Sequence, residues 1–273
     1  MKFIVNEQIE LREFLYKNIH KSKNSIKTIL KDNTYINGKK ISKYNYLLKN
    51  NDIVEIREKI EDLDIIYEDK NIIVINKKEG LLTVGTEKEK EKTAYHMVSE
   101  YLKKKNKNNK IFVIHRLDKE TSGIVMFAKN EKIKYLYQEK WNDLVKLRNY
   151  VAIVEGKTKE RGIIKSNLTE NKFQMVSSSK NGKLAITEYK KIKSNEKYTL
   201  LNVVIKTGRK NQIRVHMKEM GNVIVGDKKY GSKENPINRL CLVANKLELI
   251  NPLTNKIMRF EIDIPNSFKK VIK

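Results

Sequence analysis

The sequence predicts an α+β protein, and three observations support this class. Apolar residues recur at helical spacing in residues 9–18 and 93–103. Residues 148–156 alternate between apolar and polar side chains, as a strand does. Two apolar runs, 111–114 and 124–128, predict buried strands on either side of a polar segment. No internal repeat is visible, so helices and strands are expected to form one irregular core.

Charge is the strongest feature of the composition. The 273 residues include 58 Lys and Arg against 33 Asp and Glu, a formal net charge of +25. A globular protein this basic usually binds a polyanion. Part of the excess has a simpler origin, because the chain is rich in Lys, Asn and Ile throughout. The 39% hydrophobic content is enough for one sizeable core and a small satellite domain.

Several classes of protein are disfavoured. The single cysteine, Cys241, excludes an intramolecular disulfide framework and predicts a reducing compartment. No apolar run approaches the ~20 residues of a membrane span, and the N-terminus lacks the apolar core of a signal peptide. Four scattered histidines give no metal-site spacing. We therefore expect a soluble, cytoplasmic monomer without a metal or a membrane partner.

The first sixty residues form a candidate domain of their own. After the helix at 9–18, Ile26, Ile29 and Leu30 predict a second helix. Residues 35–39 predict a strand entering an Asn-Gly turn, and residues 53–56 another strand. We place the domain boundary between residues 60 and 61, so that residues 61–273 form the second domain.

A cluster of lysines in this first domain suits phosphate binding. Between residues 21 and 49 the only acid is Asp32. Lysines at i, i+4 and i+8 share one helix face, and a cationic stripe of this kind binds nucleic-acid backbone; an ordinary solvated surface is the alternative. The candidate RNA-binding lysines are Lys21, Lys23, Lys27 and Lys31.

The polar segment between the two apolar runs carries the candidate catalytic group. Within it the carboxylate of Asp118 lies two residues after a cation, Arg116. In isolation such an Asp most often bonds the backbone amides of a turn. However, His115-Arg116-Leu117-Asp118 followed by Thr121-Ser122-Gly123 resembles the catalytic motif of the RluA-type RNA pseudouridine synthases.

Two further segments resemble motifs of the same family, in the same order. Residues 148–156 resemble its basic-x-Tyr-x-Ala-x-Val-x-Gly strand, with Tyr150 as the tyrosine. Residues 207–216 resemble its Thr-Gly-Arg-x-x-Gln-Ile-Arg-Val-His motif, with Asn211 where the family usually has His. An earlier Lys-Pro-x-Gly-Leu pattern is matched by Lys77 and Gly80, but Lys78 replaces the proline. The three motifs lie within residues 65–265.

The resemblance implies a fold and a role for each residue. It implies an α+β catalytic domain around a mixed, largely antiparallel sheet with flanking helices. The first domain resembles an S4 RNA-binding domain, built from two helices and short strands. Asp118 is the catalytic residue, Arg214 pairs with it and keeps it ionised, and Tyr150 packs against the uracil or acts as a base. Arg116 fills the place of the extruded base, and Arg209 is a further RNA contact.

The chemistry implied by the family is the conversion of uridine to pseudouridine. The reaction consumes nothing and changes no oxidation state, so no cofactor is expected. The expected substrate is ribosomal RNA, with tRNA as the alternative. Asp118 either adds to the sugar or promotes elimination to a glycal, and the sequence leaves both routes open. A non-catalytic RNA-binding or ribosome-assembly protein is the rival function. A glycoside hydrolase is disfavoured because the sequence indicates no second carboxylate paired with Asp118. Residues 269–273 are expected to be a frayed tail.

Overall fold

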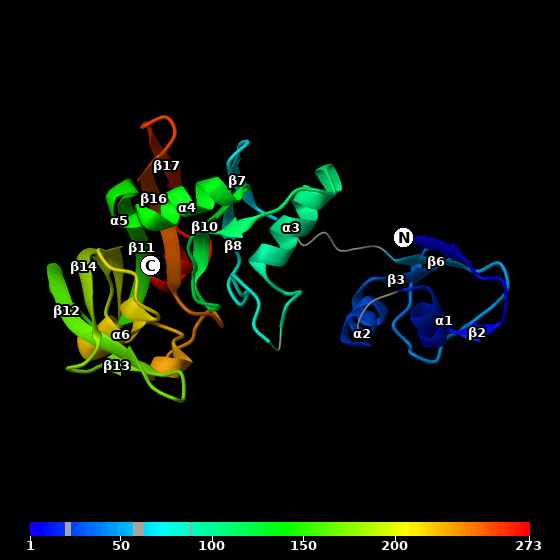
Figure 1. Ribbon diagram of the computed structural model, residues 1–273. Helices are drawn as coiled ribbons and strands as arrows, with labels where there is room; N and C mark the ends of the chain where they lie inside the picture. Colours follow the sequence, from blue (N-terminus) through cyan, green and yellow to red (C-terminus); the bar gives the residue numbers. More distant parts are fainter. Residues whose placement is uncertain (20–22, 57–62, 88) are drawn as a thin grey trace. The chain divides into compact units, whose positions relative to one another are not determined.

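The chain forms two compact units, Met1–Asp62 and Leu63–Lys273. The structure, a computed structural model, describes residues 1–19, 23–56, 63–87 and 89–273 (Figure 1). The expected boundary at residue 60 lies outside the described residues, as does Lys21 of the lysine cluster.

The N-terminal unit packs two helices against short strands. Its helices are α1 (Leu11–Asn18) and α2 (Lys23–Asp32). An antiparallel sheet has the order β1 (Lys2–Ile4), β6 (Ile53–Ile56), β3 (Thr34–Ile36) and β4 (Lys39–Lys40). A separate pair joins β2 (Ile9–Glu10) and β5 (Leu47–Leu48). The expected Asn-Gly turn connects β3 to β4, with Asn37 at φ 49° and Gly38 at φ 81°. The apolar faces of both helices, including Leu11, Leu15 and Leu30, are fully buried.

The second unit is built on one large sheet. Among the described residues, eleven strands join in it. Nine of them follow the order β13 (Val176–Ser178), β12 (Arg161–Glu170), β14 (Lys183–Ser194), β15 (Tyr198–Ile205), β11 (Val145–Glu155), β16 (Leu242–Ile250), β10 (Ser122–Ala128), β8 (Ile72–Lys77) and β7 (Ile65–Glu68). The other two, β17 (Ile257–Glu261) and β9 (Phe112–Val113), pair with β16 and β10. Only the β10–β16 pairing is parallel among these described ladders. The expected α+β class with a mixed, largely antiparallel sheet is therefore confirmed.

Alternation along β8 and β10 places helices on both faces of this end of the sheet. Ile73 and Ile75 of β8 and Val125 and Phe127 of β10 pack in the cluster that contains α3 (Ala94–Lys105). The intervening residues pack in the cluster that contains α4 (Glu131–Glu139) and α5 (Trp141–Leu144). Because successive side chains of a strand point to opposite faces, β8 and β10 are buried on both sides.

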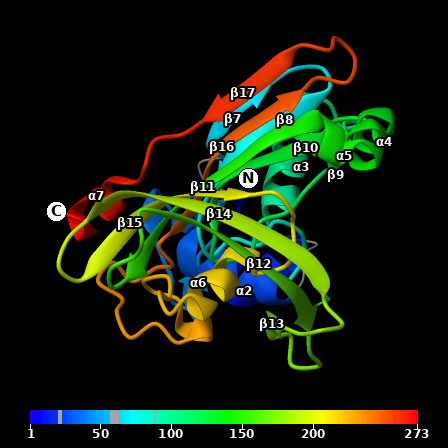
Figure 2. The same cartoon turned by 90° about the vertical axis from the view of Figure 1, so that its left-hand side faces the viewer.

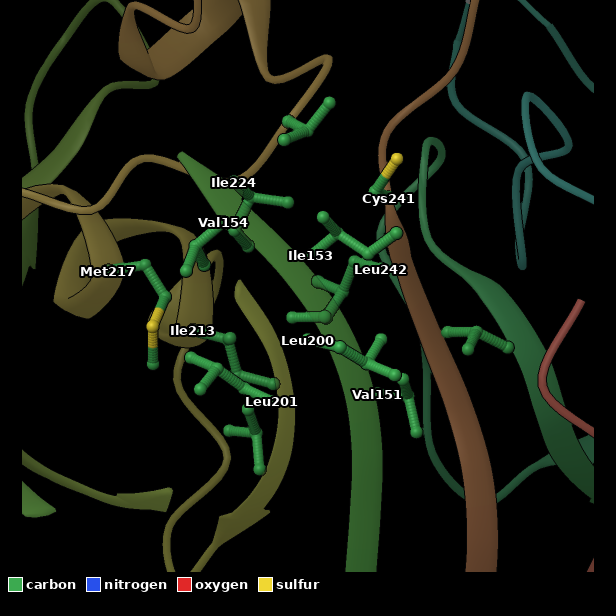
Figure 3. Packing of buried hydrophobic residues seen from close by; sticks show 14 of the residues in the cluster. Val151, Ile153, Val154, Leu200, Leu201, Ile213, Met217, Ile224, Cys241 and Leu242 are labelled. Atoms are coloured by element: carbon green, nitrogen blue, oxygen red, sulfur yellow. The ribbon is translucent and has the colours of Figure 1, made fainter. Parts of the chain in front are cut away.

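The other half of the sheet is covered by α6 (Gln212–Glu219) and α7 (Asn266–Val271). Ile213 and Met217 of α6 pack on β11 and β15, as Figure 3 shows. The same cluster contains Cys241, which is fully buried as the sequence suggested. Figure 2 shows β12 and β14 curving over α6. A short 3₁₀ helix, η1 (Lys228–Tyr230), follows α6.

The expectation of a frayed C-terminal tail was wrong. Residues from 266 onward form α7, in which Phe268 is fully buried, and Ile272 just beyond it is 4% exposed. Both side chains join the core beside β11 and β15. The lysines at the end of the sequence suggested a solvated tail. Two apolar residues four apart lie on one helix face, and they suffice to attach this short helix to the core.

Candidate active site

A cleft of the second unit lies beside the Asp118 segment. It has a volume of about 640 Å³. Its walls include the segment 115–121, the strand β11, and the turn and helix start at 208–214. Asp118, Tyr150 and Arg214 all line it, together with Arg116 and Arg209. The catalytic residues expected from the sequence therefore meet in one place.

Backbone contacts fix the segment that carries Asp118. The hydroxyl of Thr83 donates to the carbonyl of Leu117 at 2.8 Å and accepts the Leu117 amide at 3.1 Å. The amide of Thr121 donates to the carbonyl of Asp118 at 3.2 Å, which closes a turn around Lys119. A loop held at both ends keeps its side chains oriented without help from a ligand.

Lys77 also holds the Asp118 segment in place, through a hydrogen bond to its backbone. It is 1% exposed, and its ammonium donates to the carbonyls of Leu81 at 2.7 Å and Lys119 at 3.2 Å. Burial lowers the pKa of Lys77 to about 8, although Asp118 and Glu120 act in the opposite direction. The sequence matched Lys77 to a family pattern but did not indicate this contact across to the Asp118 turn.

Gly123 marks the end of the segment, where no side chain fits. Its φ is +118°, a conformation that other residues avoid. A Cβ here would lie 2.2 Å from the carbonyl oxygen of Ala244 on β16. This close approach allows β10 to pair in parallel with β16 directly after the turn.

His115 begins the segment as a neutral side chain. Its Nε2 accepts a hydrogen bond from the amide of Met126 at 3.1 Å, which requires an unprotonated nitrogen. Burial, with a smaller contribution from Arg148, lowers the pKa of His115 to about 4. The ring also lies against Trp141, with centroids 5.2 Å apart. His115 therefore acts here as a fixed acceptor and packing group.

Asp118 itself is largely enclosed. Its side chain is 27% exposed at the cleft wall. Burial raises its pKa above the usual 3.8, Arg214 offsets part of this rise, and Glu120 adds to it. Arg214 acts on Asp118 in the expected direction, toward the ionised form, but burial shifts the pKa further in the opposite direction.

The principal partner of Arg214 is Asp227, which the sequence argument missed. Arg214 donates from Nε to Asp227 Oδ2 at 2.8 Å and from Nη2 to Oδ1 at 2.7 Å. The remaining Nη1 lies 3.2 Å from Glu120 Oε2 and 4.0 Å from Asp118 Oδ2. The expected Arg214–Asp118 pair is the longest of these four contacts, so the main partner of Arg214 is Asp227. Gly226-Asp227 was visible in the sequence, but nothing there connected it to Arg214.

Asn211 immediately precedes α6, the helix that carries Arg214. It has a left-handed conformation with φ 53°, which Asn tolerates better than most residues. Its amide donates to the hydroxyl of Tyr230 at 3.0 Å, and its carbonyl oxygen lies 3.5 Å from Arg214 Nη1. Asn thus fits the position at which a histidine was expected from the family pattern.

Tyr150 lies on β11 in the wall opposite Arg214's helix start and is partly buried. Burial raises its pKa to about 12; Arg148 lowers it, and Asp118 raises it. The phenol is therefore neutral near pH 7, and a neutral phenol is a poor proton acceptor. The expected packing of Tyr150 against the uracil is compatible with this form.

The expected RNA-binding residues are found in both units. Arg116 and Arg209 line the cleft with exposed side chains. Lys23, Lys27 and Lys31 are exposed on α2 of the N-terminal unit. In the described part of the chain no helix is long and apolar enough to cross a membrane. No group of three His, Cys, Asp or Glu in that part is arranged to hold a metal ion.

Comparison with known proteins identifies the family. A sequence model described as RNA pseudouridylate synthase matches residues 71–219, which include Asp118, Tyr150 and Arg214. The chain belongs to the RNA pseudouridine synthase family. It is thus an isomerase that acts on RNA, and Asp118 lies within the matched domain.

Individual relatives agree with this assignment. A "Ribosomal large subunit pseudouridine synthase C" of Rickettsia felis is 36% identical over 223 residues, covering 79% of this chain and 72% of that protein. An "Uncharacterized RNA pseudouridine synthase YhcT" of Bacillus subtilis is 30% identical, covering 78% of this chain and 72% of the relative. The solved structure "Human RNA Pseudouridylate Synthase Domain Containing 4" shares the fold, with a TM-score of 0.63 and 23% identity over 77% of this chain and 92% of its own.

Proposed function

We propose that this RNA pseudouridine synthase acts on ribosomal RNA and uses Asp118 as its nucleophile. The observation that carries the proposal is the meeting of Asp118, Tyr150 and Arg214 in one cleft. Relatives named as ribosomal large subunit pseudouridine synthases favour ribosomal RNA over tRNA.

In the proposed reaction the N1–C1′ bond of uridine breaks, the uracil turns over, and C5 bonds to C1′. The proton released from C5 is balanced by one taken up at N1, so nothing is consumed. A carboxylate suits the developing positive charge on the sugar, as it does in glycoside hydrolysis. Asp118 supplies that carboxylate, Tyr150 packs against the uracil, and Arg214 Nη1 favours the ionised form. Arg116 would occupy the place left by the extruded base.

The N-terminal unit is proposed to be an S4-like RNA-binding domain. The lysines at positions 23, 27 and 31 are spaced along one helix and exposed, which suits contact with phosphates. We also propose a cytoplasmic monomer, since a single buried cysteine suits a reducing compartment. Light scattering of the purified protein measures the oligomeric state.

Pseudouridine mapping tests the proposal. Ribosomal RNA and tRNA from a strain without this protein should lack pseudouridine at one or more rRNA positions and keep every tRNA position. Purified protein should restore the missing rRNA modification in vitro. Asp118→Asn is nearly isosteric, so it should bind the same RNA and form no pseudouridine. Conversion by Asp118→Asn near the wild-type rate would rule out Asp118 as nucleophile; a loss confined to tRNA would rule out the rRNA assignment.

A further inference from the structure

Arg148 is a charged residue of the cleft to which the proposed chemistry gives no role. It lies on β11, lines the cleft and is partly buried. Its Nη2 donates to the carbonyl of Lys206 at 2.8 Å. Within the described residues no carboxylate forms an ion pair with it.

The other cations of the cleft are either paired with a carboxylate or exposed to solvent. Arg214 is paired with Asp227 and Glu120, and Lys210 is paired with Glu170. Arg116 and Arg209 are exposed, so water solvates them. Arg148 alone combines burial with a neutral partner among the cleft cations that the structure describes. A cation removed from water is costly unless an anion accompanies it.

Gly208 keeps Arg148 in place. A Cβ at this glycine would lie 2.8 Å from Arg148 Nη1, so the guanidinium lies directly against the backbone of the turn that precedes Arg214. The bond to Lys206 fixes the same guanidinium from the other end of this turn. Arg148 is therefore oriented before any ligand arrives.

Arg148 and Tyr150 leave the same face of β11. They are two residues apart, so their Cα atoms are separated by about 6.6 Å along the strand. If Tyr150 packs against the uracil, the guanidinium lies within one nucleotide of that base. The anion nearest to a base in RNA is a phosphate of its own backbone.

We propose that Arg148 binds a phosphate that flanks the target uridine and so positions that nucleotide for attack by Asp118. This inference rests on the proposed function of the cleft. Arginine suits the task because its planar, forked donors match phosphate oxygens. The phosphate is the one on either the 5′ or the 3′ side, and the experiment distinguishes them.

The test combines one protein variant with one altered linkage in the RNA. RNA fragments containing the mapped uridine carry a neutral methylphosphonate at either its 5′ or its 3′ linkage. One of these should lower wild-type kcat/KM about tenfold, as expected for a charge-assisted hydrogen bond. Arg148→Gln should show a similar loss with unmodified RNA and no further loss with that modified RNA. Arg148→Lys should recover part of the rate.

Two further variants serve as independent perturbation and control. Gly208→Ala should imitate Arg148→Gln, because the added methyl displaces the guanidinium. Arg259→Gln removes an exposed arginine of β17 that pairs with Glu248, so it should keep the wild-type sensitivity to the methylphosphonate. Losses that multiply between Arg148→Gln and both modified linkages would overturn the proposal.

A binding measurement separates this inference from the proposed function. Uridine, uridine 5′-monophosphate and uridine 3′-monophosphate are titrated into the full chain and followed by NMR. One monophosphate should bind the wild type more tightly than uridine does, and Arg148→Gln should remove the difference. Lack of pseudouridine formation by the wild type would refute the proposed function, while this titration still decides the role of Arg148. Equal binding of all three compounds to the wild type would refute the phosphate site.

Discussion

Asp227 holds the Arg214 guanidinium through two nitrogens, at 2.7 and 2.8 Å, and leaves only Nη1 turned toward Asp118. Asp227 is 1% exposed, and Arg214 is 3% exposed. A two-point contact between planar groups fixes the orientation as well as the position of the arginine. The distance from Nη1 to the Asp118 carboxylate is thus set by a residue that does not line the cleft.

The first prediction concerns this positioning. Asp227→Asn keeps the shape but leaves Arg214 buried beside a neutral amide, so we expect a loss of roughly 3 kcal/mol in the free energy of unfolding. The single-turnover rate should fall at least about tenfold, as for the loss of a charge-assisted hydrogen bond, while RNA affinity stays unchanged. Denaturant unfolding and single-turnover conversion at saturating RNA measure the two effects. A less stable variant with the wild-type rate would mean that Asp227 stabilises the fold without positioning Arg214.

The second prediction concerns Glu120, which competes for the same nitrogen. Glu120 raises the pKa of Asp118, whereas Arg214 lowers it. If the ionised carboxylate is the active form, the rate falls as pH drops through this pKa. Glu120→Gln should therefore move the acidic limb of the rate profile to lower pH. Single-turnover rates from pH 4 to 8 measure the shift; Glu196→Gln, an exposed position in the turn between β14 and β15, is the control. An unmoved limb would show that Glu120 does not act on Asp118.

The third prediction follows from the buried ammonium of Lys77. Its folded-state pKa of about 8 lies below the usual lysine pKa of 10.5, so the unfolded chain binds more protons between these pH values. Stability from this group therefore rises as pH increases from about 8 to 10.5. Lys77→Met lacks the titration, so wild type should gain up to roughly 3 kcal/mol relative to it over this range. Urea unfolding of both proteins at each pH measures the difference, and parallel pH curves would contradict the burial argument.

The fourth prediction concerns the lysines of α2. Changing Lys23, Lys27 and Lys31 together to Gln should weaken RNA binding and reduce its dependence on salt. Each lost phosphate contact lowers the slope of log K against log salt by about 0.7 to 0.9, so three contacts lower it by roughly 2 to 3. Filter binding across a salt series gives the slope. Changing the exposed Lys256, Lys269 and Lys270 removes the same charge elsewhere and serves as the control. Equal slopes for both triple variants would show that α2 is merely a solvated face.

The sequence was sufficient where local pattern decides structure. The apolar runs around Asp118, the helix at α3 and the Asn-Gly turn of the N-terminal unit follow from spacing alone. The hairpin of β12 and β13 could not be found this way. Most residues of β12 face solvent, and only Leu168 is buried. The strand therefore shows little alternation of apolar and polar residues from which it could be predicted.

Site residues whose partners are distant in the sequence could not be predicted either. Asp118, Tyr150 and Arg214 were found because each lies in a recognisable motif. Asp227 and Arg148 owe their importance to partners that the chain brings near only after folding. The contact of Arg148 with Gly208 spans sixty residues, and no local pattern encodes it.

The continuity of the large sheet determines how the enzyme can take up its substrate. The Asp118 turn leads into β10, which joins β16, then β11 with Tyr150, then β15, which leads to the helix of Arg214. The cleft residues of β11 and the segments that carry Asp118 and Arg214 are thus all attached to one hydrogen-bonded sheet. A continuous sheet resists deformation, so we expect the conformational work to fall on the RNA, which must present its uridine to the cleft. Uridines in strands that already bend or unpair easily are therefore modified at the lowest energetic cost.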